Sequence, residues 1–127
     1  MDRVDKMFRA CSDRTRLRIL NLLRDGEHCV GDLVEALVIP QPTASRHLGY
    51  LRGSGLVTCR KDGQWALYSL AEPTDALHRA LVGCLEPCET ELGELKEDRL
   101  RSHALRKNGG CCPTVTRKPG PVWMARG

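Results

Sequence analysis

The chain has 127 residues, of which 41% are hydrophobic and 28% charged, and its formal net charge is +4 at pH 7. This length fits about one domain with a modest core, and so small a chain gains stability from dimerisation. The sequence has no run of 18 apolar residues, and its start, MDRVDKMFRACSDR, is charged from the second residue. We therefore expect no membrane span and no signal peptide. We expect a cytoplasmic protein whose seven cysteines are thiols, metal ligands or redox sensors rather than structural disulfides.

The first part of the chain predicts a series of short helices. Apolar spacing and capping residues place these helices over residues 2–11, 13–25, 30–37 and 42–53. In the last of them Ala44, Leu48 and Leu51 form one buried stripe, so the polar residues of that helix point away from the stripe or lie on its flanks.

Two strands are predicted next. Residues 56–61 and 64–70 are rich in β-forming side chains and are joined by Asp62-Gly63. A turn of this type between two such runs is a strong hairpin signal, because both turn positions need positive φ.

The last third predicts helix, a break and a tail. Apolar spacing favours a helix over 74–86, and Pro87 predicts a kink or break there, because proline lacks an N–H donor. Further helix is expected to about residue 106. We therefore divide the chain into a domain, 1–106, and a flexible cysteine-containing tail, 107–127.

Charge and element order together indicate DNA binding. Residues 41–71 carry four basic side chains and one acidic side chain, which suits the phosphate backbone. A helix with a polar outer face fits the major groove, and a following hairpin can lie along the flanking phosphates. The candidate DNA-binding residues are Gln41, Thr43, Ser45, Arg46, His47 and Tyr50 on the helix, and Arg60, Lys61 and Gln64 on the hairpin.

Three segments in order carry a family resemblance. DRTRLRIL opens the region, QPTASRHLGYLRGSGLV contains the polar helix, and KDGQWALYSL forms the hairpin. This combination over residues 12–70 resembles the ArsR/SmtB family of metalloregulatory repressors. The resemblance implies a mainly α (α+β) winged helix-turn-helix with a two-stranded β-hairpin wing. It further implies a homodimer built from the N- and C-terminal helices, which binds a double-stranded DNA operator until an inducer releases it.

The cysteines suggest what the inducer is. Arsenic-sensing members often carry Cys-Val-Cys-Asp-Leu, whereas this chain reads Cys29-Val30-Gly31-Asp32-Leu33, which leaves too few thiolates for a soft ion. The better candidates are four later cysteines: Cys84, Cys88, Cys111 and Cys112. Three thiolates from this set suit As(III) or Sb(III), and four suit Zn(II) or Cd(II). No organic cofactor is expected.

Other readings of the same cysteines remain open. Two of them could become linked in a redox or persulfide sensor. A zinc site on the last helix would use Asp75, His78 and Glu89, although the full ligand pattern is missing. We do not expect an enzyme, because the chain lacks a Cys-x-x-Cys motif and a phosphate-cradling glycine loop. A constitutive DNA-binding protein would need none of the late cysteines.

Overall fold

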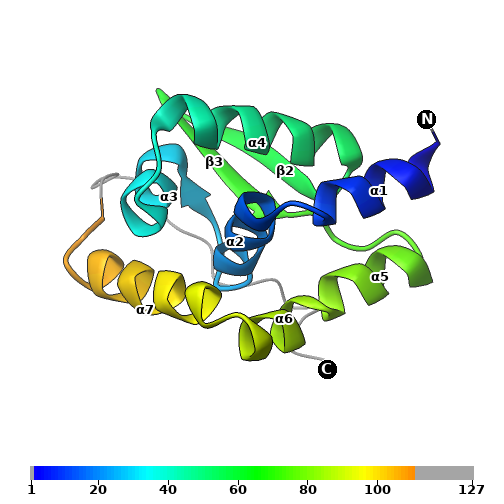
Figure 1. The fold of residues 1–127 in the computed structure, drawn as a ribbon. Helices are drawn as coiled ribbons and strands as arrows, with labels where there is room; N and C mark the ends of the chain where they lie inside the picture. Colours follow the sequence, from blue (N-terminus) through cyan, green and yellow to red (C-terminus); the bar gives the residue numbers. More distant parts are fainter. Residues whose placement is uncertain (1, 111–127) are drawn as a thin grey trace.

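A computed structural model describes residues 2–110 as a helical body with a small antiparallel sheet (Figure 1). Its elements are α1 (Arg3–Cys11), α2 (Arg14–Leu23), β1 (His28–Cys29), α3 (Val30–Leu37), α4 (Gln41–Ser54), β2 (Val57–Asp62), β3 (Trp65–Leu70), α5 (Ala76–Gly83), α6 (Leu85–Glu91) and α7 (Gly93–Lys107). The order α2, α3, α4 and hairpin is the predicted winged helix-turn-helix. No described helix is long and apolar enough to cross a membrane.

Local side chains explain where several helices begin and end. The carboxylate of Asp13 accepts a hydrogen bond from the backbone N–H of Arg16 and caps α2. Asp75 caps α5 in the same way, through the N–H of His78. At the other end of α4, Gly55 adopts φ +86°, the left-handed conformation that terminates a helix without strain.

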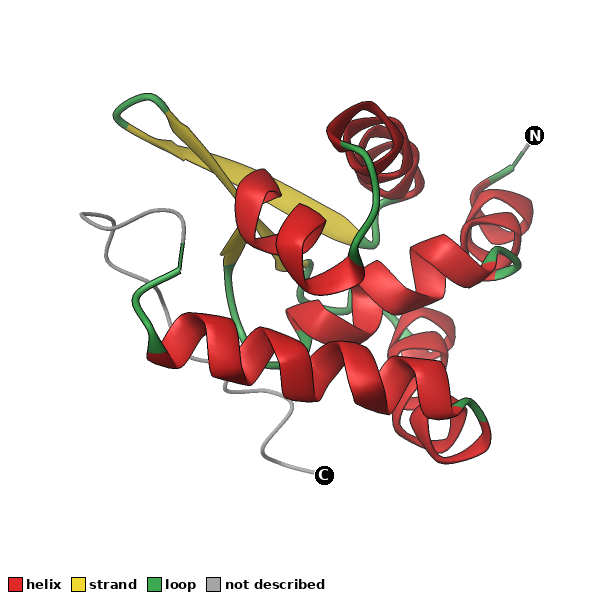
Figure 2. Ribbon diagram, turned by 60° about the vertical axis from the view of Figure 1, so that its left-hand side comes forward, coloured by secondary structure: helices red, strands yellow, loops and turns green. Residues whose placement is uncertain are grey.

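The sheet has the strand order β1-β3-β2. β2 and β3 form the predicted hairpin, with Asp62 opposite Trp65 and Gly63 at φ +61° in the turn. The hairpin extends beyond the helical body as a wing (Figure 2). β1 was not predicted: its two residues pair with Tyr68 and Leu67 of β3 and tie the start of α3 to the wing.

The core forms where α2, α3, α4 and the base of the hairpin meet. Its fully buried members include Ile19, Leu33, Leu48 and Leu56. α2 lies at the centre of the body, and α7 runs beneath α2 and α3 and contacts both (Figure 1). The C-terminal helix α7 therefore supports α2 and α3.

The predicted break at Pro87 was placed three residues too late. The helix ends at Gly83 and restarts at Leu85, so Pro87 becomes the third residue of α6. This position suits proline, because the first amides of a helix have no acceptor within it. The N–H of Cys88 donates to the carbonyl of Cys84 at 3.0 Å, and these two cysteines stay one helical turn apart.

Candidate nucleic-acid interface and cysteine sites

The outer face of α4 carries most of the polar residues that the sequence singled out. The side chains of Gln41, Ser45, Arg46 and Tyr50 are exposed, and Thr43 is half-buried. The opposite face is fixed to the core by three fully buried residues, Ala44, Leu48 and Leu51. The helix thus presents hydrogen-bond donors outward from a rigid base.

His47 lies on the inner flank of this helix rather than on its outer face. Its side chain is only 9% exposed, and Nη1 of Arg16 approaches its Nδ1 at 3.3 Å. Burial lowers the pKa of His47 below its ordinary value, and the positive charges of Arg16 and Arg46 act in the same direction, against the attraction of Asp13.

Arg16 connects three helices, a role that sequence reasoning missed. Its Nε and Nη2 donate to the carbonyls of Ala10 and Arg9 at 2.9 Å each, at the end of α1. Its guanidinium also lies over the ring of Tyr50, 4.2 Å from the centroid, within cation–π range. The contacts join residues far apart in sequence, so helical periodicity gave no sign of them.

The predicted DNA-binding residues of the wing differ in their surroundings. Lys61 and Gln64 are exposed near the hairpin turn. Arg60 instead forms a two-pronged ion pair with Glu27, each Nε and Nη2 lying 2.7 Å from a carboxylate oxygen. Glu27 is buried, so this pair braces β2 against the segment before β1.

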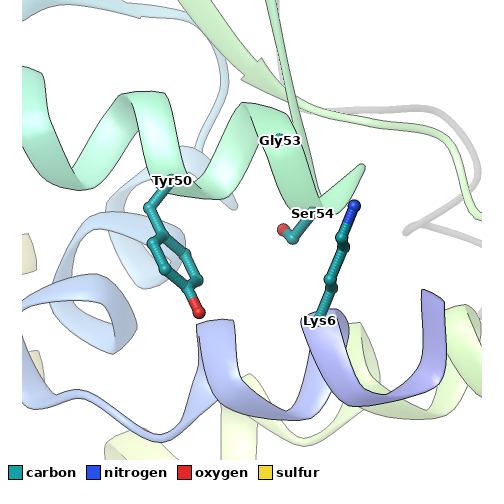
Figure 3. Close-up of a pocket in the computed structure, with 4 residues that line it drawn as sticks. All are labelled: Lys6, Tyr50, Gly53 and Ser54. Carbon is teal, nitrogen blue, oxygen red and sulfur yellow. The ribbon is translucent and has the colours of Figure 1, made fainter. Parts of the chain in front are cut away.

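A shallow pocket of about 300 Å³ lies between α1 and the C-terminal half of α4. It is lined by Lys6, Tyr50, Gly53 and Ser54 (Figure 3). The ring of Tyr50 points from α4 toward α1, and the Lys6 side chain rises from α1 toward the end of α4. The pocket therefore places one ammonium group beside the C-terminal end of α4.

Two of the four predicted sensor cysteines lie within the described residues. Cys84 is exposed at the junction of α5 and α6, Cys88 is half-buried on α6, and both carry free thiols. Cys111 and Cys112 lie outside the described residues. Within residues 2–110, no group of three or more His, Cys, Asp or Glu side chains is arranged to hold a metal ion.

The residues of the alternative zinc site have other partners. Asp75 caps α5 and pairs with Arg3. His78 is buried and its Nδ1 accepts a hydrogen bond from the backbone of Thr74. Glu89 accepts two hydrogen bonds from Arg99, which lower its pKa to about 2. Each of the three candidates therefore has a structural role in the described part of the chain.

Cys29 is disulfide-bonded, so it is not one of the thiols or metal ligands that the sequence led us to expect, and it also caps the start of α3. It is buried and its sulfur accepts a hydrogen bond from the backbone N–H of Asp32 at 3.4 Å, which caps α3.

Comparison with known proteins identifies the family. The family described as "Bacterial regulatory protein, arsR family" matches residues 13–58. The arsenical resistance operon repressor of Escherichia coli (strain K12) is 42% identical over 87 residues, which are 68% of this chain and 74% of that protein. The chain belongs to the ArsR family. This confirms the family, the winged helix-turn-helix fold and the expectation of a DNA-binding transcriptional regulator rather than an enzyme.

Two solved structures have a similar fold. Reduced HlyU from Vibrio cholerae N16961 matches with a TM-score of 0.59 and 32% identity, over 68% of this chain and 87% of that one. The transcriptional repressor BigR from Xylella fastidiosa matches with a TM-score of 0.59 and 30% identity, over 70% and 85%.

Proposed function

We propose that this ArsR-family protein is a cytoplasmic homodimeric repressor that As(III), or another soft metal ion, releases from its DNA operator by binding cysteine thiolates. The observation that carries the proposal is a donor-rich face of α4 together with two free thiols one helical turn apart, at the start of α6 and within it. The name of the Escherichia coli relative, an arsenical resistance operon repressor, supports the choice of arsenic.

The proposed DNA contacts are assigned from the exposure of side chains on α4 and the wing. Gln41 and Arg46 lie outward on the first turns of α4 and can reach base edges, while Thr43, Ser45 and Tyr50 can bind phosphates. Lys61 and Gln64 of the wing reach the flanking backbone. His47 and Arg60 act on DNA indirectly, by setting the position of α4 and of β2 through Arg16 and Glu27.

The second copy of the chain would cover the outer face of α1. Phe8 is 53% exposed there, next to the exposed Val4 on the same face, and both side chains are large and apolar. α5 adds the exposed Ala80 and the half-buried Leu81. Burying such a surface against a second copy removes apolar area from water and creates the two-fold symmetry that a palindromic operator requires.

The inducer site of the proposal uses the four late cysteines. Cys84 and Cys88 share one face of α6, with Cβ atoms about 5–6 Å apart at this spacing, and Cys111 or Cys112 would add further sulfur ligands. As(III) and Sb(III) take three sulfurs, whereas Cd(II) and Zn(II) take four. The ion releases DNA if it binds the DNA-free conformation more tightly than the DNA-bound one.

Fluorescence anisotropy of a labelled duplex, selected by the protein from a random pool, tests this function. Arsenite should lower the anisotropy of the wild-type complex to that of free DNA, and the double variant Cys84→Ser, Cys88→Ser should stay bound. The matched control, Cys59→Ser, alters a free thiol on β2 and should respond like the wild type. Retention of DNA by the wild type at saturating arsenite contradicts the proposal.

A redox sensor of the same fold is the second candidate. It is favoured by the free thiols of Cys84 and Cys88 and by the description of one structural neighbour as reduced HlyU. This candidate predicts that a peroxide or persulfide releases DNA, that dithiothreitol restores binding, and that chelators have no effect.

A further inference from the structure

The last turns of α7 hold the segment around β1. Nη2 of Arg106 donates to the backbone carbonyl of Glu27 at 3.2 Å, and its Nη1 lies 3.0 Å from Nε2 of His28. The hydroxyl of Ser102, one turn earlier on α7, lies 3.2 Å from the same nitrogen. This end of α7 lies on the side of the body from which the wing extends (Figure 2).

The neutral imidazole of His28 accepts these contacts. Its Nδ1 lies 2.9 Å from the backbone carbonyl of Gly26, and because a carbonyl oxygen can only accept, Nδ1 carries the proton. Nε2 is then the acceptor that faces the Arg106 guanidinium and the Ser102 hydroxyl. Burial, helped by Arg106, lowers the pKa of His28 to about 4, so the ring is neutral near pH 7 and these contacts are compatible with one another.

The same segment holds both strands of the wing. The carboxylate of Glu27 accepts hydrogen bonds from Nε and Nη2 of Arg60 on β2, at 2.7 Å each, and from the hydroxyl of Ser69 on β3 at 3.4 Å. His28 pairs with Tyr68 of β3. Because Glu27 and His28 are both buried, these two residues form a rigid link between α7 and the wing.

The geometry of a strand connects this link to DNA. Neighbouring side chains of a strand point to opposite faces, so a β2 that is held through Arg60 presents Lys61 on its other face, where the side chain is exposed. An ammonium group must reach a phosphate oxygen to neutralise it and release its counterion. The angle of the hairpin therefore determines whether Lys61 reaches the DNA backbone.

We propose that Arg106 is a positioning residue for DNA binding, which holds the wing at the angle at which Lys61 meets a phosphate. Arg106 acts through the backbone of Glu27 and the ring of His28 and needs no contact with DNA itself. Ser102 supports the same ring from the same helix. This inference rests on the contact between wing and DNA in the proposed function, and it adds a residue of the C-terminal helix to the groups that determine DNA affinity.

A double-mutant cycle in DNA binding tests this role. The full-length wild type, Arg106→Ala, Lys61→Ala and the double variant are titrated against the selected duplex over a series of salt concentrations. Loss of one phosphate contact reduces the slope of log binding constant against log salt concentration by about 0.9, which weakens binding about eightfold at a salt concentration of about 0.1 M. Arg106→Ala and Lys61→Ala should each show this loss, and the double variant should bind within about twofold of Lys61→Ala.

Two further variants separate positioning from the loss of a charge. Lys107→Ala removes the same charge from the next residue of α7, whose side chain is exposed, and should keep the slope of the wild type. Ser102→Ala changes no charge and removes a hydrogen bond to His28. It should weaken DNA binding by a smaller factor than Arg106→Ala, and this effect should also disappear when Lys61 is replaced.

The outcomes separate the inference from the proposed function. If Arg106→Ala, with folding verified by circular dichroism, keeps the wild-type slope or weakens binding equally with and without Lys61, the inference is overturned and release by arsenite is unaffected. If Lys61→Ala keeps the wild-type slope, the wing does not bind phosphate, and the proposed wing contact and the inference are both overturned. Should Arg106→Ala fail to fold, Ser102→Ala decides the question by the same criterion.

Discussion

Replacing Asp98 by asparagine removes a buried charge that anchors α7 to the helix-turn-helix. Asp98 is 1% exposed, and its two carboxylate oxygens accept hydrogen bonds from Nε and Nη2 of Arg18 at 2.8 and 2.9 Å. Nη2 of Arg18 also donates to the carbonyl of Leu37, and Arg101 donates to that of Ala36. The ion pair thus fixes the end of α3, one residue before the turn that leads to α4.

The expected loss in the free energy of unfolding depends on the contacts that Arg18 keeps after the substitution. Removing one partner of a buried ion pair costs about 3–5 kcal/mol. Arg18 keeps its hydrogen bond to Leu37 and a second carboxylate, Glu94, at 3.8 Å, so we expect the lower end, about 3 kcal/mol. This is a large part of the stability of a small domain, which is on the order of 5–15 kcal/mol.

Urea unfolding followed by circular dichroism, at one fixed protein concentration, measures this cost. The matched control is Glu94→Gln on the same helix, whose side chain is 44% exposed and whose loss should cost less than about 1 kcal/mol. If Asp98→Asn and Glu94→Gln cost the same, α7 is not anchored through this pair and the reasoning is refuted.

Three further predictions concern the turn, pH and DNA. Val38 is 74% exposed and adopts φ +56°, a backbone conformation that strains residues other than glycine. Val38→Gly should therefore raise the free energy of unfolding by about 1 kcal/mol, whereas Val38→Ala should not. Equal effects of the two variants in urea melts would argue against this strain. Burial, helped by Arg106, lowers the pKa of His28 to about 4. The free energy of unfolding should therefore fall as the pH drops from about 6.5 through 4, because over this range only the unfolded chain takes up that proton. His28→Gln should flatten this part of the pH dependence, and an unchanged pH dependence would contradict the assignment. Arg46→Ala should weaken binding to the selected duplex by about 1–3 kcal/mol. Lys61→Ala should weaken binding to all DNA sequences and reduce the slope of log binding constant against log salt concentration by about one. Identical salt and sequence dependence in both variants would refute these separate roles.

Local patterns allowed most of the fold to be predicted. α3 has the predicted bounds, 30–37, because its apolar spacing and its end are encoded within a few residues. The hairpin was predicted in the same way, but its turn is formed by Gly63 and Gln64 rather than by Asp62-Gly63. Asp62 pairs with Trp65 at the end of β2, and of these residues only Gly63 has positive φ. β1 could not be predicted, because a two-residue strand has no periodicity of its own and exists only where β3 offers an edge. The break before α6 was misplaced because proline is tolerated in a first helical turn.

The candidate sites were less predictable, since they depend on contacts between distant residues. A helical wheel placed His47 on a flank, but only the structure shows its contact with Arg16, 31 residues away. Arg60 was chosen for its charge, yet its partner Glu27 lies 33 residues earlier.

The central claim is that occupation of the cysteine thiols and binding of DNA oppose each other in one protein. The most direct test is the arsenite affinity of the full-length wild type, measured with and without a saturating amount of the selected duplex. The account predicts that DNA weakens arsenite binding by the same factor by which arsenite weakens DNA binding, about 5- to 150-fold for typical couplings. An arsenite affinity that is unchanged by DNA would contradict it.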